Sequence, residues 1–346
     1  MTNTAYPLAE QAIRILENAR EAGYFPSAAL RVFDRDGTLF HHEMGDVREN
    51  SLFDVASLTK IATSTMVLMA VERGLLALNQ PIVDLLPDLL GDSELQARLQ
   101  GITVDRLLSH SSTLPAWYPT YADGRDFSVM IKAAILSQQP VEGVLYSDIN
   151  FMLLGKLVER LYRLPLDQCL QQVLAKPLQL GQMLYCPGQG LDIIPSGYGN
   201  PSEEQMCPEM GLHYDRWRPQ ELVVGQVHDG NAWYYFGGVA GHAGIFATAE
   251  AYEKLVRLYL TTSSPVLVDS LREWAPTRGL GWQMGDMYPS GCGHTGFTGT
   301  SVYLSKEKNI GCVLMTNRLS YPGRAPMLTN PIRRAMHRLV AGVEGQ

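Results

Sequence analysis

A helix that is apolar on almost every side constrains the fold of this chain more than any other feature. Residues 61–71, with the sequence IATSTMVLMAV, contain no charged side chain. Because such a helix has almost no face for water, it has to lie inside the protein with other elements packed around it. The sequence therefore predicts a large core around this helix, and a chain of 346 residues is long enough to build one.

A serine and a lysine stand just before this run, in the segment Ser57-Leu-Thr-Lys60. Residues three apart share one face of a helix, so the two side chains can meet. The start of a helix also favours negative charge that develops on a serine oxygen. A lysine that opens so apolar a helix is costly unless it has a partner or a function. The pattern predicts that Ser57 is a nucleophile and that Lys60 takes part in its proton transfer.

The alternative is a serine N-cap followed by a surface lysine. The spacing alone is weak evidence for a nucleophile, because it occurs a second time in the chain. Ser305-Lys-Glu-Lys308 has the same spacing, but it falls in a polar turn between two predicted strands. We interpret this second copy as chance. The apolar setting of Ser57 distinguishes the two.

A tyrosine precedes a second predicted helix. Residues 149–161 carry apolar side chains at helical spacing, and Ser147 or Asp148 is a natural N-cap for them. Tyr146 either packs ahead of this helix or projects towards Ser57 and shares a proton with Lys60. Free tyrosine and lysine have pKa values of about 10 and 10.4. Neither is a base at neutral pH unless burial or a nearby charge shifts its pKa, so the second role requires a close pair.

A glycine-rich segment, residues 291–304, contains His294-Thr-Gly296 and ends in an alternating run that predicts a strand. Glycine in a strand often marks the close approach of a ligand or another backbone. A substrate that lies along the edge of a sheet would require such an approach. The simpler alternative is a glycine-rich hairpin with a surface histidine.

The three strings Ser57–Lys60, Tyr146–Asp148 and His294–Gly296, in this order, resemble the signature of serine β-lactamases and penicillin-binding proteins. They are most similar to the branch of class C β-lactamases with the related esterases and peptidases, in which the middle string is Y-x-N and the last may be H-T-G. Segments 107–115, 227–233 and 237–248 also resemble esterase-type members. The resemblance covers about residues 25–340.

This resemblance implies an enzyme with a covalent acyl-serine intermediate, and it assigns roles to individual residues. The catalytic residues would be Ser57, Lys60 and Tyr146, with the backbone N–H groups of Ser57 and Phe297 as oxyanion hole and with Asp148, His294, Thr295 and Gly296 in contact with the substrate. We therefore expect a serine hydrolase, either an esterase or an amidase or peptidase, without cofactor or metal. The alternative is a binding protein on the same fold that is acylated once, as a sensor or scaffold.

Two departures from the family pattern bear on the substrate. Asp148 replaces an asparagine, and an ionised carboxylate can accept a hydrogen bond but cannot donate one. It would also keep Lys60 charged and leave more of the proton transfer to Tyr146. His294 replaces a common lysine and is a weaker anchor for a carboxylate. Both changes predict neutral or cationic substrates and poor β-lactamase activity.

The order of predicted elements indicates an α+β fold whose sheet is built from both ends of the chain. Helices are expected over residues 7–22 and 330–343, and strands over 28–33, 38–43, 281–284, 300–304 and 310–316. The sheet and terminal helices would form one domain, residues 1–52 and 241–346, and residues 53–240 a mainly helical insertion. With the resemblance, this predicts a β-lactamase/transpeptidase-like fold with a five-stranded antiparallel sheet.

Composition limits the partners. The net charge is −7 and no lysine- or arginine-rich run occurs, which argues against nucleic acid. The five cysteines form no C-x-x-C pair, and His41-His42-Glu43 is more simply an exposed strand end than a metal site. We expect a small ester or peptide-like substrate and no membrane span. The amino end lacks an export signal, which predicts the cytoplasm, although an exported protein whose leader had been removed would give the same sequence.

Overall fold

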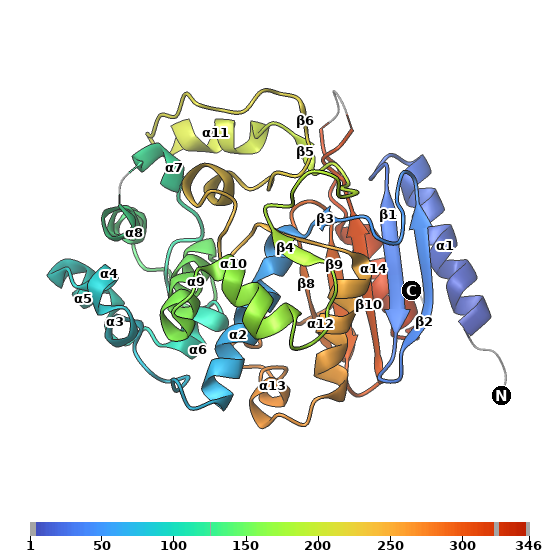
Figure 1. Ribbon diagram of the computed structural model, residues 1–346, viewed down its shortest axis with the longest axis horizontal. Helices are drawn as coiled ribbons and strands as arrows, with labels where there is room; N and C mark the ends of the chain where they lie inside the picture. The colour runs from blue at the N-terminus through green and yellow to red at the C-terminus, as the bar shows by residue number, and fades with distance from the viewer. Residues whose placement is uncertain (1–4, 125, 322–324, 344–346) are drawn as a thin grey trace.

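Five antiparallel strands in the order β2-β1-β10-β9-β8 form the main sheet of the computed structural model, which describes residues 5–124, 126–321 and 325–343 (Figure 1). The strands are β1 (Ala28–Phe33), β2 (Thr38–Met44), β8 (Cys292–Thr295), β9 (Ser301–Ser305) and β10 (Ile310–Thr316). β1 from the amino end pairs with β10 from the carboxyl end, with Ala28 opposite Thr316. The predicted five-stranded antiparallel sheet, built from both ends of the chain, is confirmed.

The prediction for the fifth strand was wrong. Residues 281–284 do not form a strand, and only Gln283 pairs with the outer edge of β8, through two backbone hydrogen bonds to Gly293 of 2.8 and 2.9 Å. The strand is β8 itself. Gly293 within it and the flanking Gly291 and Gly296 give this segment little strand propensity. A Cβ on Gly293 would overlap the carbonyl oxygen of Val302, so the missing side chain lets β8 lie against β9.

Helices cover both faces of the sheet. On one face, α1 (Ala5–Glu21) and α14 (Asn330–Val340) enclose a core that contains Leu16, Leu30 and Met336. On the other face, α12 (Ala249–Thr261) packs on β1 and β10, and Leu255 and Val313 join the larger core. Side chains of a strand alternate between faces, so each inner strand contributes to both cores. Figure 1 shows α1 outside β1 and β2, as the predicted terminal helix requires.

The segment between β2 and α12 contains most of the helices. Its helices are α2 (Thr59–Glu72), α3 (Ile82–Leu85), α4 (Pro87–Leu90), α5 (Ser93–Leu99), α6 (Val104–Leu108), α7 (Thr120–Asp123), α8 (Phe127–Leu136), α9 (Asp148–Tyr162), α10 (Leu166–Cys169) and α11 (Pro201–Glu209), with a 3₁₀ turn at Ala56–Leu58 and π turns at Leu170–Ala175 and Asn231–Tyr235. Helix α2 packs against α9 and against α13 (Pro265–Asp269), and its residues 59–68 are all buried. The prediction of a central, enclosed helix is therefore confirmed.

Two small sheets complete the fold. One contains β3 (Phe53–Asp54), β7 (Ile245–Ala247) and β4 (Met183–Tyr185), and the other β5 (Gly197–Tyr198) and β6 (Leu222–Val223). β3 ends just before the 3₁₀ turn that contains Ser57, so its pairing with β7 fixes the approach to α2. No helix of the described ranges is long and apolar enough to cross a membrane.

The packing of β8 generates a stability prediction. Gly293→Ala places a methyl group against the Val302 carbonyl and the Tyr288 ring, and we expect it to lower the free energy of unfolding by about 1–3 kcal/mol, the usual cost of overpacking. Gly188→Ala is the matched control, because a Cβ there would meet no atom within 4 Å. Denaturant unfolding of both variants measures the difference. Equal stabilities would contradict the close approach of β8 to β9.

Candidate active site

The turn that carries Ser57 is held by hydrogen bonds from distant parts of the chain. The buried carboxylate of Asp54 accepts from the backbone N–H of Ala56 at 2.9 Å and of His228 at 2.7 Å. The hydroxyl of Thr298 donates to the Asp54 carbonyl at 2.8 Å. Burial raises the pKa of Asp54 to about 6, although both backbone N–H groups lower it. The position of Ser57 therefore depends on contacts with both the insertion and the β8–β9 turn.

Lys60 is fully buried among polar partners. Its Nζ donates to Ser57 Oγ at 3.0 Å and to the His242 carbonyl at 3.1 Å, and it forms an ion pair with Asp148 Oδ1 at 2.7 Å. Burial lowers the pKa of Lys60, but the charges of Asp148 and Tyr146 outweigh it and raise the pKa to about 12. The meeting of Ser57 and Lys60 that the sequence predicted is present, and the lysine is held as a cation.

Tyr146 lies against both residues. Lys60 Nζ is 4.9 Å from the centroid of the Tyr146 ring, and Lys60 and Ser57 both interact with the phenol hydroxyl. Burial raises the pKa of Tyr146, and the adjacent Lys60 charge offsets this only in part. Both partners of Ser57 are therefore protonated near neutral pH, so a proton has to leave the network before it can accept one from Ser57.

The segment of residues 107–115 supports Tyr146 from behind. The His110 ring packs 4.6 Å from the Tyr146 ring, centroid to centroid. His110 Nδ1 accepts from the Ser147 N–H at 3.0 Å, and the His110 carbonyl accepts from the Leu145 N–H at 3.0 Å. Ser147 also donates to the Pro115 carbonyl at 2.6 Å. The neighbours of Tyr146 on both sides are thus fixed by one loop.

The β8–β9 turn brings the proposed oxyanion-hole amide to the site. Thr295, Gly296 and Phe297 line the same cavity as Ser57. Within the described ranges, neither the Ser57 N–H nor the Phe297 N–H donates a hydrogen bond to the protein. A Cβ on Gly296 would collide with the Thr300 hydroxyl, so glycine lets the turn approach Ser57. Both amides are therefore free to stabilise an oxyanion.

His294 lies behind the cavity rather than on its wall. Its side chain is 1% exposed, and its ring is 5.9 Å from the Tyr146 ring, centroid to centroid. Burial and then the Lys60 charge lower the pKa of His294 to about 3, so the imidazole is neutral. We expected His294 to face the substrate, and its position does not match that expectation. In a strand, neighbouring residues point to opposite faces, and here it is Thr295 that lines the cavity.

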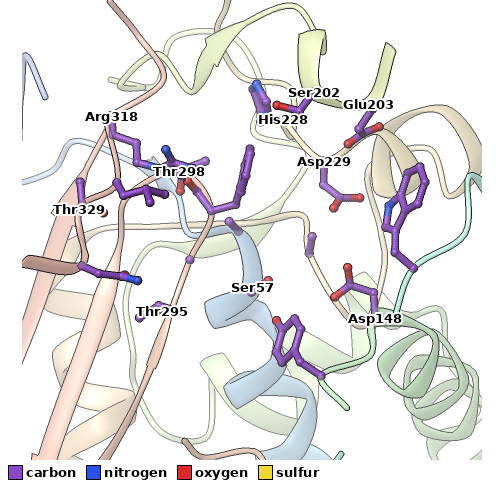
Figure 2. A pocket seen from close by; sticks show the side chains of 18 of the residues that line it. Ser57, Asp148, Ser202, Glu203, His228, Asp229, Thr295, Thr298, Arg318 and Thr329 are labelled. Atoms are coloured by element: carbon purple, nitrogen blue, oxygen red, sulfur yellow. Dashed lines mark hydrogen bonds between the residues drawn. The ribbon is translucent and has the colours of Figure 1, made fainter. Parts of the chain in front are cut away.

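The cavity in front of Ser57 has a volume of about 460 Å³. Figure 2 shows Asp148, Asp229 and Glu203 on one side of it and Arg318 and Thr329 on the other, with Ser57 between them. Asp148 lines the cavity, as a substrate contact would, but its carboxylate is bound by Lys60. The cavity therefore has an acidic wall on the insertion and a basic wall beside the main sheet.

Sequence reasoning missed four charged residues of this cavity, namely Asp229, Glu203, Arg318 and Arg333. Asp229 lies in the family-like segment 227–233, which was the one available signal. Glu203 lies in α11, Arg318 follows β10 and Arg333 lies in α14, so these three come together only in the folded protein. The described residues contain no group of three or more His, Cys, Asp or Glu that could hold a metal ion.

Comparison with known proteins agrees with this geometry. A sequence profile of the beta-lactamase family matches residues 12–335. The chain belongs to the beta-lactamase family. It is 31% identical over 318 residues to the N-acetylmuramyl-L-alanine amidase of Bacillus subtilis (strain 168), which covers 80% of this chain and 70% of the amidase. Family membership confirms the resemblance inferred from the three strings, and with it a serine hydrolase.

Solved structures of other proteins share the fold. EstCE1, described as a hydrolase with promiscuous acyltransferase activity, superposes with a TM-score of 0.69 at 16% identity, over 96% of this chain and 99% of that one. A class C β-lactamase from Rhodobacter sphaeroides gives 0.68 at 19% identity, over 96% and 99%. The β-lactamase-like fold predicted from the sequence is therefore confirmed.

The Lys60–Asp148 ion pair of this family member generates a pH prediction. Asp148→Asn removes the charge that raises the pKa of Lys60, so burial should dominate and the pKa should fall. The rise of kcat/KM with pH should then occur at lower pH, by roughly one to three pH units, the usual effect of losing an adjacent opposite charge. A pH profile with a nitrophenyl ester measures this. An unchanged profile would show that Asp148 does not control the proton network.

Proposed function

We propose that this protein hydrolyses small esters or amides through a covalent acyl intermediate on Ser57. The observation that carries the proposal is the convergence of Ser57, Lys60 and Tyr146 at one end of the cavity, with the Ser57 and Lys60 side chains 3.0 Å apart. Splitting hydrolysis at an acyl-enzyme needs a nucleophile, a proton carrier and an oxyanion hole. The site has a residue or amide in place for each.

In the proposed reaction, Ser57 Oγ attacks the substrate carbonyl and the N–H groups of Ser57 and Phe297 stabilise the oxygen that becomes negative. The proton of Ser57 passes to Tyr146 or Lys60 once that pair has lost a proton, and the pair then protonates the departing nitrogen or oxygen. Water then attacks the carbonyl of the acyl-enzyme and gives its proton to the same pair. The pair returns a proton to Ser57 Oγ as the acid product leaves. Because Lys60 and Tyr146 are both protonated in the resting enzyme, we expect the rate to rise with pH above neutrality.

The B. subtilis relative is named as an amidase of N-acetylmuramyl-L-alanine, which supports an amide as the natural substrate class. A cavity of about 460 Å³ suits a small peptide-like molecule. The alternative of a sensor that is acylated only once uses the same residues. It differs in turnover, since a sensor would release one equivalent of leaving group and stop.

Labelling tests the nucleophile. A fluorophosphonate should modify Ser57, and Ser57→Ala should abolish both labelling and ester turnover while thermal unfolding stays that of a folded protein. Ser305→Ala is the matched control, because Ser305 has the same spacing to a lysine but lies at the end of β9. Label on another serine, or turnover in Ser57→Ala, would contradict the proposal.

The Asp148 carboxylate also predicts weak β-lactamase activity. A penicillin carries an acylamide carbonyl that an asparagine can donate to, whereas Asp148 can only accept and is already paired with Lys60. His294 adds nothing to this expectation, because its side chain does not line the cavity. We expect kcat/KM for a short-chain nitrophenyl ester to exceed that for a chromogenic cephalosporin by at least about tenfold, or 1.4 kcal/mol. Faster opening of the cephalosporin than of any ester would contradict this.

A further inference from the structure

The acidic wall of the cavity is built by Asp229 and Glu203, neither of which has a part in the proposed chemistry at Ser57. Asp229 Oδ1 accepts from the Ala232 N–H at 2.8 Å and lies 3.1 Å from His242 Nε2. Glu203 Oε1 accepts from the Gly230 N–H at 2.8 Å. A Cβ on Gly230 would overlap Glu203 Oε2, so glycine at this position is what admits the glutamate. Both carboxyl groups are thus held in place by backbone donors.

Glu203 has no cationic side chain beside it among the described residues, whereas Asp229 faces His242 at 3.1 Å. Across the described ranges, no lysine or arginine lies within salt-bridge distance of Asp229 or Glu203. Glu203 Oε2 is buried without a hydrogen-bond partner. Burial and then the Asp229 charge raise the pKa of Glu203 to about 8, as expected for a carboxyl group that lacks a compensating cation.

His228 provides an independent observation on the same wall. Its side chain is only 6% exposed, lines the cavity and, among the described residues, makes no hydrogen bond through its ring. Burial and then the Arg218 charge lower its pKa to about 4, so the imidazole is neutral. Figure 2 shows His228 and Ser202 beside Glu203. The ring nitrogens of His228 therefore have no partner in the described part of the protein and are available to a ligand in the cavity.

Other lining residues favour a cation at this end of the cavity. Trp117 also lines it, and the face of an indole ring attracts cations. Asp148 cannot bind this cation, because its carboxylate already forms an ion pair with Lys60 at 2.7 Å. Figure 2 shows Arg318 on the opposite wall, and Arg333, which also lines the cavity, donates to the Gly296 carbonyl. A cation is therefore repelled from that side and drawn to the acidic one.

We infer that Asp229, Glu203 and His228 form a subsite for the ammonium group of an amine-bearing substrate, held next to the carbonyl that Ser57 attacks. Asp229 would accept a charge-assisted hydrogen bond from the ammonium group. So would Glu203, because the adjacent ammonium group lowers its pKa and ionises it when the substrate binds. His228 would accept a third hydrogen bond through a free ring nitrogen. This inference rests on the proposed function, since it names the substrate class of the same site. It assigns specificity to α11 and to the segment after β6, outside the three family strings.

Matched esters test the subsite. The 4-nitrophenyl esters of D-alanine, L-alanine and propanoic acid share the leaving group and differ at the position of the amine. At a pH of about 7 a large share of the amine is protonated. We expect kcat/KM for at least one alanine ester to exceed that for the propanoate by roughly tenfold or more, the scale of a hydrogen bond to a charged group. Ser57→Ala supplies the background rate.

The Glu203→Gln variant tests whether the acidic wall causes the preference for an alanine ester. Glutamine keeps the acceptor for the Gly230 N–H but removes the charge, so the ratio of alanine to propanoate should fall by roughly tenfold. Glu204→Gln, one residue along α11 and outside the cavity, should keep the native ratio. A native enzyme that turns over all three esters at Ser57 without preferring an amine would overturn the subsite alone. No Ser57-dependent turnover of any ester would overturn the proposed function and the subsite with it.

Discussion

The buried charge of Lys60 is the interaction on which the rest of the site depends. An ammonium group inside so apolar a helix is tolerated only if its hydrogen atoms find acceptors and its charge finds a counter-charge. Ser57, the His242 carbonyl and Asp148 meet these needs, and they come from three separate segments of the chain. One lysine therefore ties the nucleophile to the start of α9 and to the loop before β7.

The same ion pair sets the chemistry of the resting enzyme. With asparagine at position 148, burial alone would push Lys60 towards its neutral form. With Asp148 in place the lysine is held as a cation, and Tyr146 keeps its proton because it is buried. The Asp148 carboxylate thus fixes the position of Lys60 but makes it a weaker base at neutral pH. Catalysis in this family member would depend on how readily the network loses one proton.

Much of this could be predicted from the sequence, for identifiable reasons. Helix α2 is apolar on nearly every side, so local pattern and final structure agree there. Ser57, Lys60 and Tyr146 each sit at the start of a helix, a position that a pattern can locate. β8 was missed because glycines conceal its strand character. The buried side of His294 and the acidic wall of Glu203 were missed because they depend on packing between segments far apart in the chain.

The central claim is that Lys60 and Tyr146 act on Ser57 as one proton network, and a double-mutant cycle tests it most directly. The rates to compare are kcat/KM for a nitrophenyl ester in Lys60→Ala, Tyr146→Phe and the double variant, each checked for folding by thermal unfolding. Each single change should cost roughly 10²–10⁴-fold, the scale of a positioned acid–base group. The double variant should lose little more than either single one, because residues that act as a unit are not additive. Losses that multiply in the double variant would contradict a shared network.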